Sequence, residues 1–195
     1  MRSILTSPRS VLLTLIAAAC CCIGLVQHGT GQEITPKKPN SANSLITRGQ
    51  VKLNLAGAEL VVAETRKKAE AMKVKLNIAV VDDGGHLLAF ARMDGARPAS
   101  AYTAMTKATA SATMRTATGP VPAGAANPDP LLNLALQHTA AVGGGKMTTL
   151  YGGVPIVLDD QVIGAVGCGG GTGEQDAEAA RAGIAALLKE LGEKQ

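Results

Sequence analysis

The sequence is poor in aromatic residues: two of its 195 residues are tyrosine, one is phenylalanine and none is tryptophan. Few side chains are therefore available to stack on unpaired bases, which is a main source of affinity for single-stranded nucleic acids. The 19 basic and 15 acidic residues give a net charge of +4, which falls to +2 without the N-terminal Arg2 and Arg9. A positive charge this weak is not the basic surface that is typical of a nucleic-acid-binding protein, so we expect no nucleic-acid partner.

Cysteine and histidine are also scarce. Three of the four cysteines, at 20–22, lie in an N-terminal apolar run, so a chain without that run keeps Cys168 alone and forms no internal disulfide. A chain without residues 1–31 also loses His28 and keeps only His86 and His138. Two histidines exclude a multi-histidine zinc site within one chain.

The N-terminal residues 1–31 have the pattern of an export signal. Arg2 and Arg9 precede an apolar run at 11–26, which is shorter than a membrane span requires. We expect cleavage before Gln32, a secreted or periplasmic protein, and no stable membrane span after cleavage. A lipoprotein cut at Cys20 and a retained anchor are the alternatives. Residues 32–48 are polar and aperiodic, which predicts a flexible linker before one domain at 49–192.

Four helices are predicted within that domain, at 50–73, at 100–116, from Asp129 to the glycines at 143–145, and after Thr172. The second consists of small residues, so a neighbouring element can approach it closely. Asp129 and Pro130 have the pattern of an N-cap followed by the first helical position. The first helix is expected to bury Leu53, Ala56, Leu60, Ala63 and Lys67. The third is expected to bury Leu131, Leu134, Ala135 and His138.

Strands are predicted at 76–82, 86–93, 154–158 and 162–167, with a further short strand at 146–151. The turns at 83–85 and 159–160 join these strands into hairpins. Hairpins imply antiparallel pairing, so the fold class is α+β. We expect an α/β sandwich with a mainly antiparallel sheet flanked by helices, in a profilin-like layering.

A glycine-rich stretch, GCGGGTGEQD at 167–176, joins the last strand to the last helix. Its spacing matches neither G-x-G-x-x-G nor a P-loop. The first turns of the helix contain Glu174, Asp176 and Glu178. Their negative charges would repel a phosphate or other anion bound at the helix N-terminus. Thr172 and Gln175 form a capping-box pattern instead, so we interpret the stretch as a capped strand-to-helix connection.

Several motifs together resemble the GlcG/HbpS family of haem-binding proteins. They are IAVVDDGGHLLAFARMDGARPAS at 78–100, Lys107 with the alanine after it, GGVPI at 152–156, VIGAVGCGGGTGEQD at 162–176 and ARAGIAAL at 180–187. The resemblance covers about 50–190. It implies an antiparallel α/β sandwich, homo-oligomers, and haem binding outside the cytoplasm. Cys168 stands where the family usually has serine or alanine, either as a small buried residue or as a thiol near the site.

Basic residues are the candidates for the carboxylates of a haem-like ligand. Arg92, Asp94 and Arg97 lie together at the end of a strand, and arginine pairs bidentately with carboxylates. The alternative is a local Arg–Asp pair that braces the loop. Lys107 lies in the second helix, where it either meets the same carboxylate or is a solvated helix charge.

Haem iron usually takes His, Met, Cys or Tyr as its axial ligand. His138 and Met114 are candidates, and the resemblance adds Thr118, because a threonine in this region contacts iron in a haem-binding relative. His86, Tyr102 and Tyr151 are further options, each of which could instead be a packing or surface residue. Glu174 and Asp176 could bind iron or act as acid and base, or only cap their helix.

The leading hypothesis is an exported haem-binding protein that acts by sequestration or sensing rather than turnover. The alternative is a small-molecule or corrinoid-related enzyme, with Glu174 or Asp176 transferring a proton near Lys107. A third hypothesis is an oligomeric scaffold without a ligand.

Overall fold

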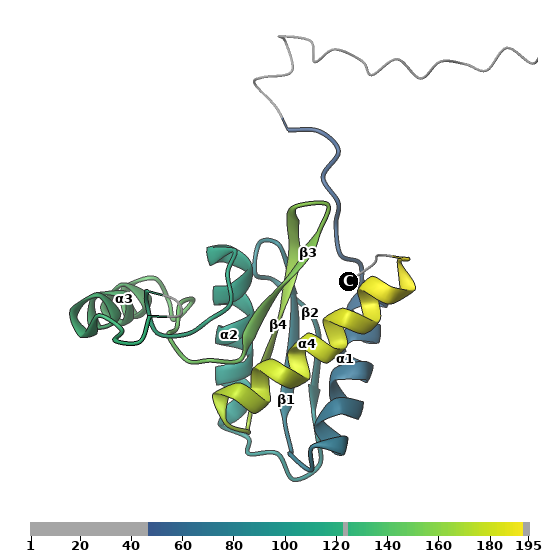
Figure 1. The fold of residues 1–195 in the computed structure, drawn as a ribbon, viewed down its shortest axis with the longest axis horizontal. Coiled ribbons are helices and arrows are strands. Elements are labelled where there is room, and N and C mark those ends of the chain that lie inside the picture. The colour runs from purple at the N-terminus through teal and green to yellow at the C-terminus, as the bar shows by residue number, and fades with distance from the viewer. Residues whose placement is uncertain (1–46, 123–124, 193–195) are drawn as a thin grey trace, which may run out of the picture. The chain divides into compact units, whose positions relative to one another are not determined.

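The computed structural model describes residues 47–122 and 125–192. The predicted signal peptide at 1–31 and nearly all of the predicted linker at 32–48 lie outside these residues. The described residues form four helices and four strands (Figure 1), in the order α1 (Leu55–Ala71), β1 (Asn77–Asp82), β2 (Leu87–Arg92), α2 (Ser100–Met114), α3 (Pro130–Val142), β3 (Gly153–Leu158), β4 (Gln161–Gly169) and α4 (Gly173–Glu190).

The strands form one antiparallel sheet in the order β2-β1-β4-β3. Two hairpins supply it, β1–β2 and β3–β4, and the central pair β1–β4 joins them. Asp159 and Asp160 both have positive φ, at 49° and 57°, as a tight two-residue hairpin turn requires. The predicted α+β sandwich with an antiparallel sheet is confirmed.

Helices cover both faces of the sheet. On one face, α1 and α4 enclose the main core, which includes Ile78, Val80 and Val166. On the opposite face α2 packs through Ala104 and Ala108. Strand alternation explains this division, because neighbouring residues of a strand point to opposite faces of the sheet.

The close packing of α2 on β4 explains two of the glycines in the glycine-rich stretch at 167–176. A Cβ atom on Gly167 would collide with the carbonyl oxygen of Ala104 and the backbone of Ala108. A Cβ atom on Gly169 would lie 2.6 Å from the carbonyl oxygen of Ser100. The small residues of α2 and the glycines of β4 thus let the two backbones meet, as the sequence predicted for this helix.

The predicted buried face of the first helix is only partly right: Leu53 is buried and Leu60 packs against the core, whereas Ala56 and Lys67 are exposed. Within the helix, the fully buried residues are Ala58, Val61, Thr65 and Ala69. The helix begins only at Leu55, because the Asn54 side chain accepts a hydrogen bond from the Gly57 N–H at 2.9 Å and caps it. Packing against α4 then determines which face of α1 is buried, because Gly183 of α4 lies directly against Thr65 and Val61.

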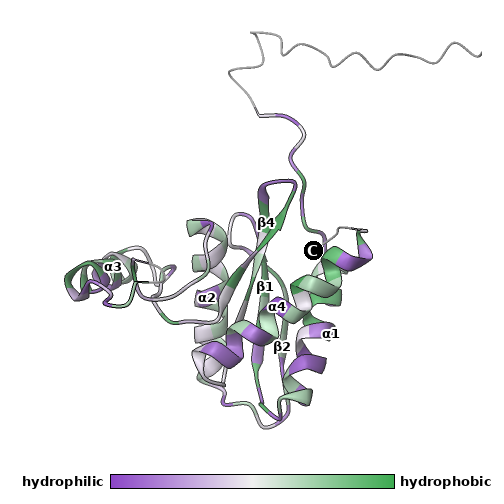
Figure 2. Ribbon diagram, viewed as in Figure 1, coloured by the Kyte–Doolittle hydropathy of each residue, from purple (hydrophilic) through white to green (hydrophobic). Residues whose placement is uncertain are grey.

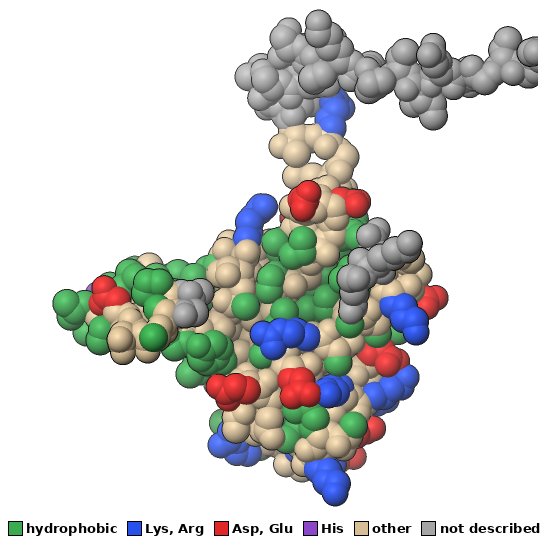
Figure 3. Space-filling model, viewed as in Figure 1, with side chains coloured by type: hydrophobic (Ala, Val, Ile, Leu, Met, Phe, Trp, Pro, Cys, Tyr) green, Lys and Arg blue, Asp and Glu red, His purple; other side chains and the backbone are tan. Residues whose placement is uncertain are grey.

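Two predictions for residues 130–151 are wrong. Residues 146–151 form no strand. The predicted apolar stripe of α3 faces solvent: Leu131 is 78% and Leu134 67% exposed, His138 is exposed, and Ala140 is the buried residue of this helix. Because α3 is apolar on several sides, its periodicity does not single out one buried face. The α3 ribbon contains hydrophobic and hydrophilic residues (Figure 2), and hydrophobic side chains gather on the surface around α3 in the space-filling view (Figure 3).

Candidate functional site

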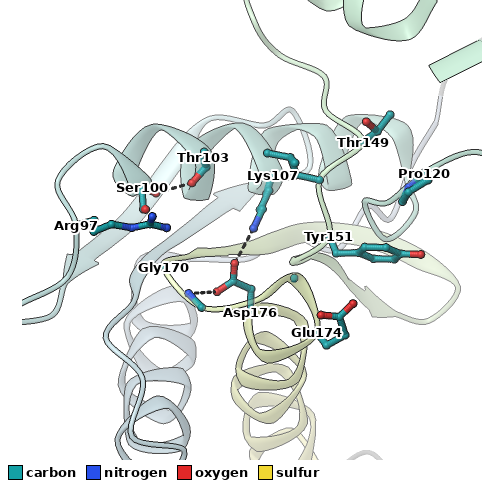
Figure 4. A pocket seen from close by; sticks show the side chains of 13 residues that line it. Arg97, Ser100, Thr103, Lys107, Pro120, Thr149, Tyr151, Gly170, Glu174 and Asp176 are labelled. Atoms are coloured by element: carbon teal, nitrogen blue, oxygen red, sulfur yellow. Dashed lines mark hydrogen bonds and ion pairs between the residues drawn. The ribbon is translucent and has the colours of Figure 1, made fainter. Parts of the chain in front are cut away.

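A cavity of about 460 Å³ lies where α2, the β4–α4 connection and the segment before β3 come together (Figure 4). Its lining comes from four parts of the sequence: positions between 97 and 107, Pro120, residues 149–151, and positions between 170 and 176. This volume falls within the range of small-molecule and cofactor sites.

A buried ion pair lies at the inner wall of this cavity. Lys107 Nζ donates to Asp176 Oδ2 at 2.7 Å and to the Cys168 carbonyl oxygen at 2.9 Å. The two charged side chains are 6% and 2% exposed. Asp176 Oδ1 accepts a further hydrogen bond from the Gly171 N–H at 3.1 Å. Two buried charges are tolerated when they are paired and hydrogen-bonded in this way.

The glycines of the GGVPI motif leave room for the side chains of this ion pair. Gly152 has a φ of 117°, and a Cβ atom there would lie 2.9 Å from Lys107 Nζ and 2.6 Å from Asp176 Cβ. The following Gly153 donates its N–H to Thr118 Oγ1 at 2.8 Å. Glycines at both positions thus allow the start of β3 to pass directly over the pair.

The glycine-rich connection forms another part of the wall. Gly170 and Gly171 line the cavity, and Thr172 caps α4 in the predicted capping box with Gln175. Glu174 lies exposed at the cavity mouth. Hydrogen bonds from its own backbone N–H and from the Thr172 side chain lower the pKa of Glu174, so its carboxyl group is an anion at neutral pH.

The cavity brings together four of the predicted site residues: Arg97, Lys107, Glu174 and Asp176. Since Lys107 and Asp176 neutralise each other, the lining keeps one further cation, Arg97, and one further anion, Glu174. Figure 4 shows these two on opposite sides of the ion pair. The Arg97 loop is held to β1 by the buried Asn77 side chain, which donates to the Arg97 carbonyl oxygen at 3.0 Å.

Arg92 and Asp94 line a separate hollow beside Arg66 and Glu70, at the end of β2. Among the described residues, the ion pairs do not include the local Arg–Asp pair that was the alternative for this loop.

Four of the candidate axial ligands, Thr118, Met114, His138 and His86, lie outside this cavity. Thr118 is buried, with its hydroxyl bound to Gly153. Met114 is at the last turn of α2, and His138 is on the exposed α3. His86 is in the β1–β2 turn, with Nδ1 3.3 Å from Asp82 Oδ1. Their functional roles stay predictions.

Cys168 is fully buried in the core beneath α4 and does not line the cavity. Burial raises the pKa of its thiol, and the negative charge of Asp176 raises it further. Of the two readings of this position, the structure favours the small buried residue.

The sequence did not single out several residues of the lining. Thr103, Pro120, Thr149 and Leu150 lie in the cavity wall, and no motif contains them; Ser100 also lines it and is the last residue of the 78–100 motif. Tyr151, weighed only as a further option, also lines the cavity, whereas Tyr102 is outside it and 73% exposed.

Among the described residues, no group of three or more His, Cys, Asp or Glu side chains is arranged to hold a metal ion. Iron binding at Glu174 and Asp176 stays a prediction. Within the same residues, no helix combines the length and apolar character needed to cross a bilayer.

The chain is similar to known proteins over nearly all of the described residues. The model of the family described as haem degrading protein HbpS-like matches residues 53–185. Protein GlcG of Escherichia coli strain K12 is 40% identical over 110 residues, which cover 56% of this chain and 75% of GlcG.

Two solved structures share the fold. Klebsiella pneumoniae protein ORFY has a TM-score of 0.61 and 30% identity, covering 74% of this chain and 97% of ORFY. The PduOC–haem complex has a TM-score of 0.59 and 29% identity, covering 70% of this chain and 95% of PduOC. Because the family model spans residues 53–185, from before α1 into α4, this chain belongs to the HbpS-like family, as its motifs indicated.

Proposed function

We propose that this protein binds haem in the cavity beside the Lys107–Asp176 pair, and that it sequesters or senses haem outside the cytoplasm. The observation that carries the proposal is a cavity with both an apolar rim and an unneutralised cation. Pro120, Leu150 and Tyr151 supply the apolar surface, and Arg97 supplies the cation. The PduOC relative with the same fold was solved in complex with haem.

The lining fits the chemistry of haem. An apolar macrocycle suits the rim of Pro120 and Leu150, and a propionate carboxylate suits the Arg97 guanidinium, which can bind it through two hydrogen bonds. The anionic Glu174 at the mouth repels carboxylates and so favours their placement toward Arg97. When bound, haem supplies electron-transfer and oxygen chemistry, while the protein binds and orients it.

A titration of the protein with haemin tests this proposal. We expect a saturable change in the Soret absorption at micromolar haemin. Arg97→Met should weaken binding by roughly 10- to 100-fold, because hydrogen bonds to charged groups contribute about 1.5–3 kcal/mol. Arg181→Met is the matched control, since Arg181 is an exposed arginine of α4 outside the cavity lining. A wild-type protein without a saturable Soret change would refute the proposal.

The extracellular or periplasmic location rests on the N-terminal sequence. We expect export of the full chain, and retention in the cytoplasm of a chain that starts at Gln32. Fractionation of producing cells, with a cytoplasmic marker enzyme, measures both. Equal distribution of the two chains would remove this part of the proposal.

We also propose that the protein is a homo-oligomer assembled through the α3 surface, defined by Leu131, Leu134 and Val142. These residues are 78%, 67% and 81% exposed, and α3 contains no charged residue. An isolated 13-residue helix is marginal in water, and exposed apolar patches mark interaction sites. An uncharged helix can pack on its own copy without burying an unpaired charge.

Light scattering coupled to size exclusion tests the assembly. The Leu131→Glu/Leu134→Glu variant should have a lower mass than the wild type. Leu191→Glu is the control, because Leu191 is 52% exposed after the end of α4. A wild-type monomer, or a double variant of unchanged mass, would contradict assembly through α3.

The alternative function, an enzyme that uses Glu174 or Asp176 for proton transfer, stays a prediction. Both carboxylate oxygens of Asp176 already accept hydrogen bonds, and the lowered pKa of Glu174 makes it a weak base. A screen for turnover that Glu174→Gln abolishes would favour this alternative. Assembly without any haem binding would instead favour the scaffold hypothesis.

A further inference from the structure

The cavity contains few groups that could bind the iron of haem. Haem iron is held in most proteins by the side chain of His, Met, Cys or Tyr. Among the residues that line the cavity there is no histidine, methionine or cysteine, and there is one tyrosine, Tyr151. The described cavity therefore offers one conventional iron ligand. An iron ligand in this cavity presupposes the haem site proposed above.

Two other donor groups near the cavity are already engaged. The Lys107 amine donates to Asp176 and to the Cys168 carbonyl oxygen. The Cys168 thiol is fully buried, and its raised pKa keeps it protonated, whereas iron binds the thiolate. Neither group is available without breaking the buried pair or opening the core.

The structure fixes the position of Tyr151. Its ring lies against Gly119, where an added Cβ atom would be 2.7 Å from Tyr151 Cε1. On the other side, Gly173 at the start of α4 lies directly against Tyr151 Cβ. Two close backbone contacts therefore restrict the side chain. It remains 48% exposed, and Figure 4 shows no hydrogen bond between its hydroxyl and the other residues drawn.

The surrounding charges are arranged to suit a ligand with a central metal and carboxylates at its edge. In Figure 4, Tyr151 lies on one side of the Lys107–Asp176 pair and Arg97 on the other. The metal donor and the carboxylate partner are thus separated across the cavity. Glu174 lies on the same side as Tyr151, so its negative charge favours a ferric cation there over a carboxylate.

We propose that Tyr151 is the axial ligand of haem in this protein, bound to the iron through its phenolate oxygen. Binding replaces the hydroxyl proton, which passes to solvent, by an oxygen–iron bond. A phenolate is a hard anionic donor, so it binds ferric iron in preference to ferrous iron. Haemin should therefore be held more tightly than its reduced form.

Spectroscopy of the haemin-loaded protein tests this assignment. We expect a high-spin ferric absorption spectrum with a phenolate-to-iron charge-transfer band, and phenolate vibrations in resonance Raman spectra. Tyr151→Phe should abolish both signatures and weaken haemin binding at least about tenfold, since even outer-shell partners of a metal ligand contribute that much. The chain has one other tyrosine, so Tyr102→Phe is the matched control and should keep both signatures.

The outcomes are distinguishable. Phenolate vibrations that persist in Tyr102→Phe support the assignment even if Tyr151→Phe fails to fold, because Tyr151 is then the one tyrosine left. Saturable haemin binding with no phenolate signature, or with a spectrum unchanged by Tyr151→Phe, would overturn the assignment and leave haem binding in place. A spectrum changed by His138→Ala instead would place the ligand on α3. No haemin binding at all would overturn both the proposed function and this assignment.

Discussion

The buried pair of Lys107 and Asp176 allows a quantitative test of what holds the cavity together. Lys107→Met removes the ammonium and leaves a buried carboxylate whose remaining partner is the Gly171 N–H. Asp176→Asn removes the carboxylate and leaves the buried ammonium of Lys107 with the Cys168 carbonyl oxygen as its remaining hydrogen-bond acceptor from the wild-type structure. Removal of one partner from a buried pair costs about 3–5 kcal/mol, because the other charge stays uncompensated.

The double variant Lys107→Met/Asp176→Asn should lose far less. It leaves no buried charge, and the asparagine can still accept from Gly171, so we expect its stability to lie within about 2 kcal/mol of the wild type. The two single losses are therefore not additive, and the coupling energy of the cycle should be at least about 3 kcal/mol.

Urea unfolding followed by circular dichroism measures all four proteins of this cycle. Each single variant should also melt roughly 6–20 °C below the wild type, given about 2–4 °C per kcal/mol for a chain of this size. Single variants within about 1 kcal/mol of the wild type would refute the reasoning, since exposed pairs have that strength. A double variant as unstable as the sum of the single ones would also refute it.

Three further predictions concern packing, thiol chemistry and pH. Gly167→Ala should destabilise the protein by about 1–3 kcal/mol in urea unfolding, because its Cβ atom meets the α2 backbone. Gly143→Ala is the control, and an equal loss there would argue against this cause. The Cys168 thiol should resist a thiol reagent until the protein unfolds, because burial raises its pKa; peptide mapping checks this, and rapid labelling of the native protein would contradict it. The hydrogen bond from Lys52 at 2.6 Å lowers the pKa of Asp83, so this carboxylate stabilises the fold above pH 4 and loses that effect as the pH falls through its lowered pKa. Asp83→Asn should remove this part of the acid dependence, by less than about 1 kcal/mol because the pair is exposed, and an unchanged acid profile would refute it.

Local chemistry made part of the fold predictable. The capping box of Thr172 and Gln175 and the cap at Asp129 involve residues no more than three positions apart, so the sequence displays them directly. The two hairpins are likewise marked by their turn residues. The buried face of α1 could be predicted only in part, because it depends on Gly183 of α4, which lies against Thr65 in the folded chain.

The candidate site was predictable only in part for a related reason. Arg97, Lys107, Glu174 and Asp176 were singled out from motifs, yet their shared cavity arises because the sheet order β2-β1-β4-β3 brings distant segments together. Tyr151 stands in a segment that the sequence assigned to a strand, so its place in the cavity wall was not evident.

The sequence by itself determined the elements whose signals are local: caps, hairpin turns, strand alternation and the motifs of the HbpS-like family. Only the tertiary structure decided that Lys107 and Asp176, 69 residues apart, share one buried hydrogen bond, and that the leucines of α3 face solvent. The physical reason is range. Capping and turn formation act over a few residues, whereas burial and ion pairing depend on which surfaces the folded chain brings together.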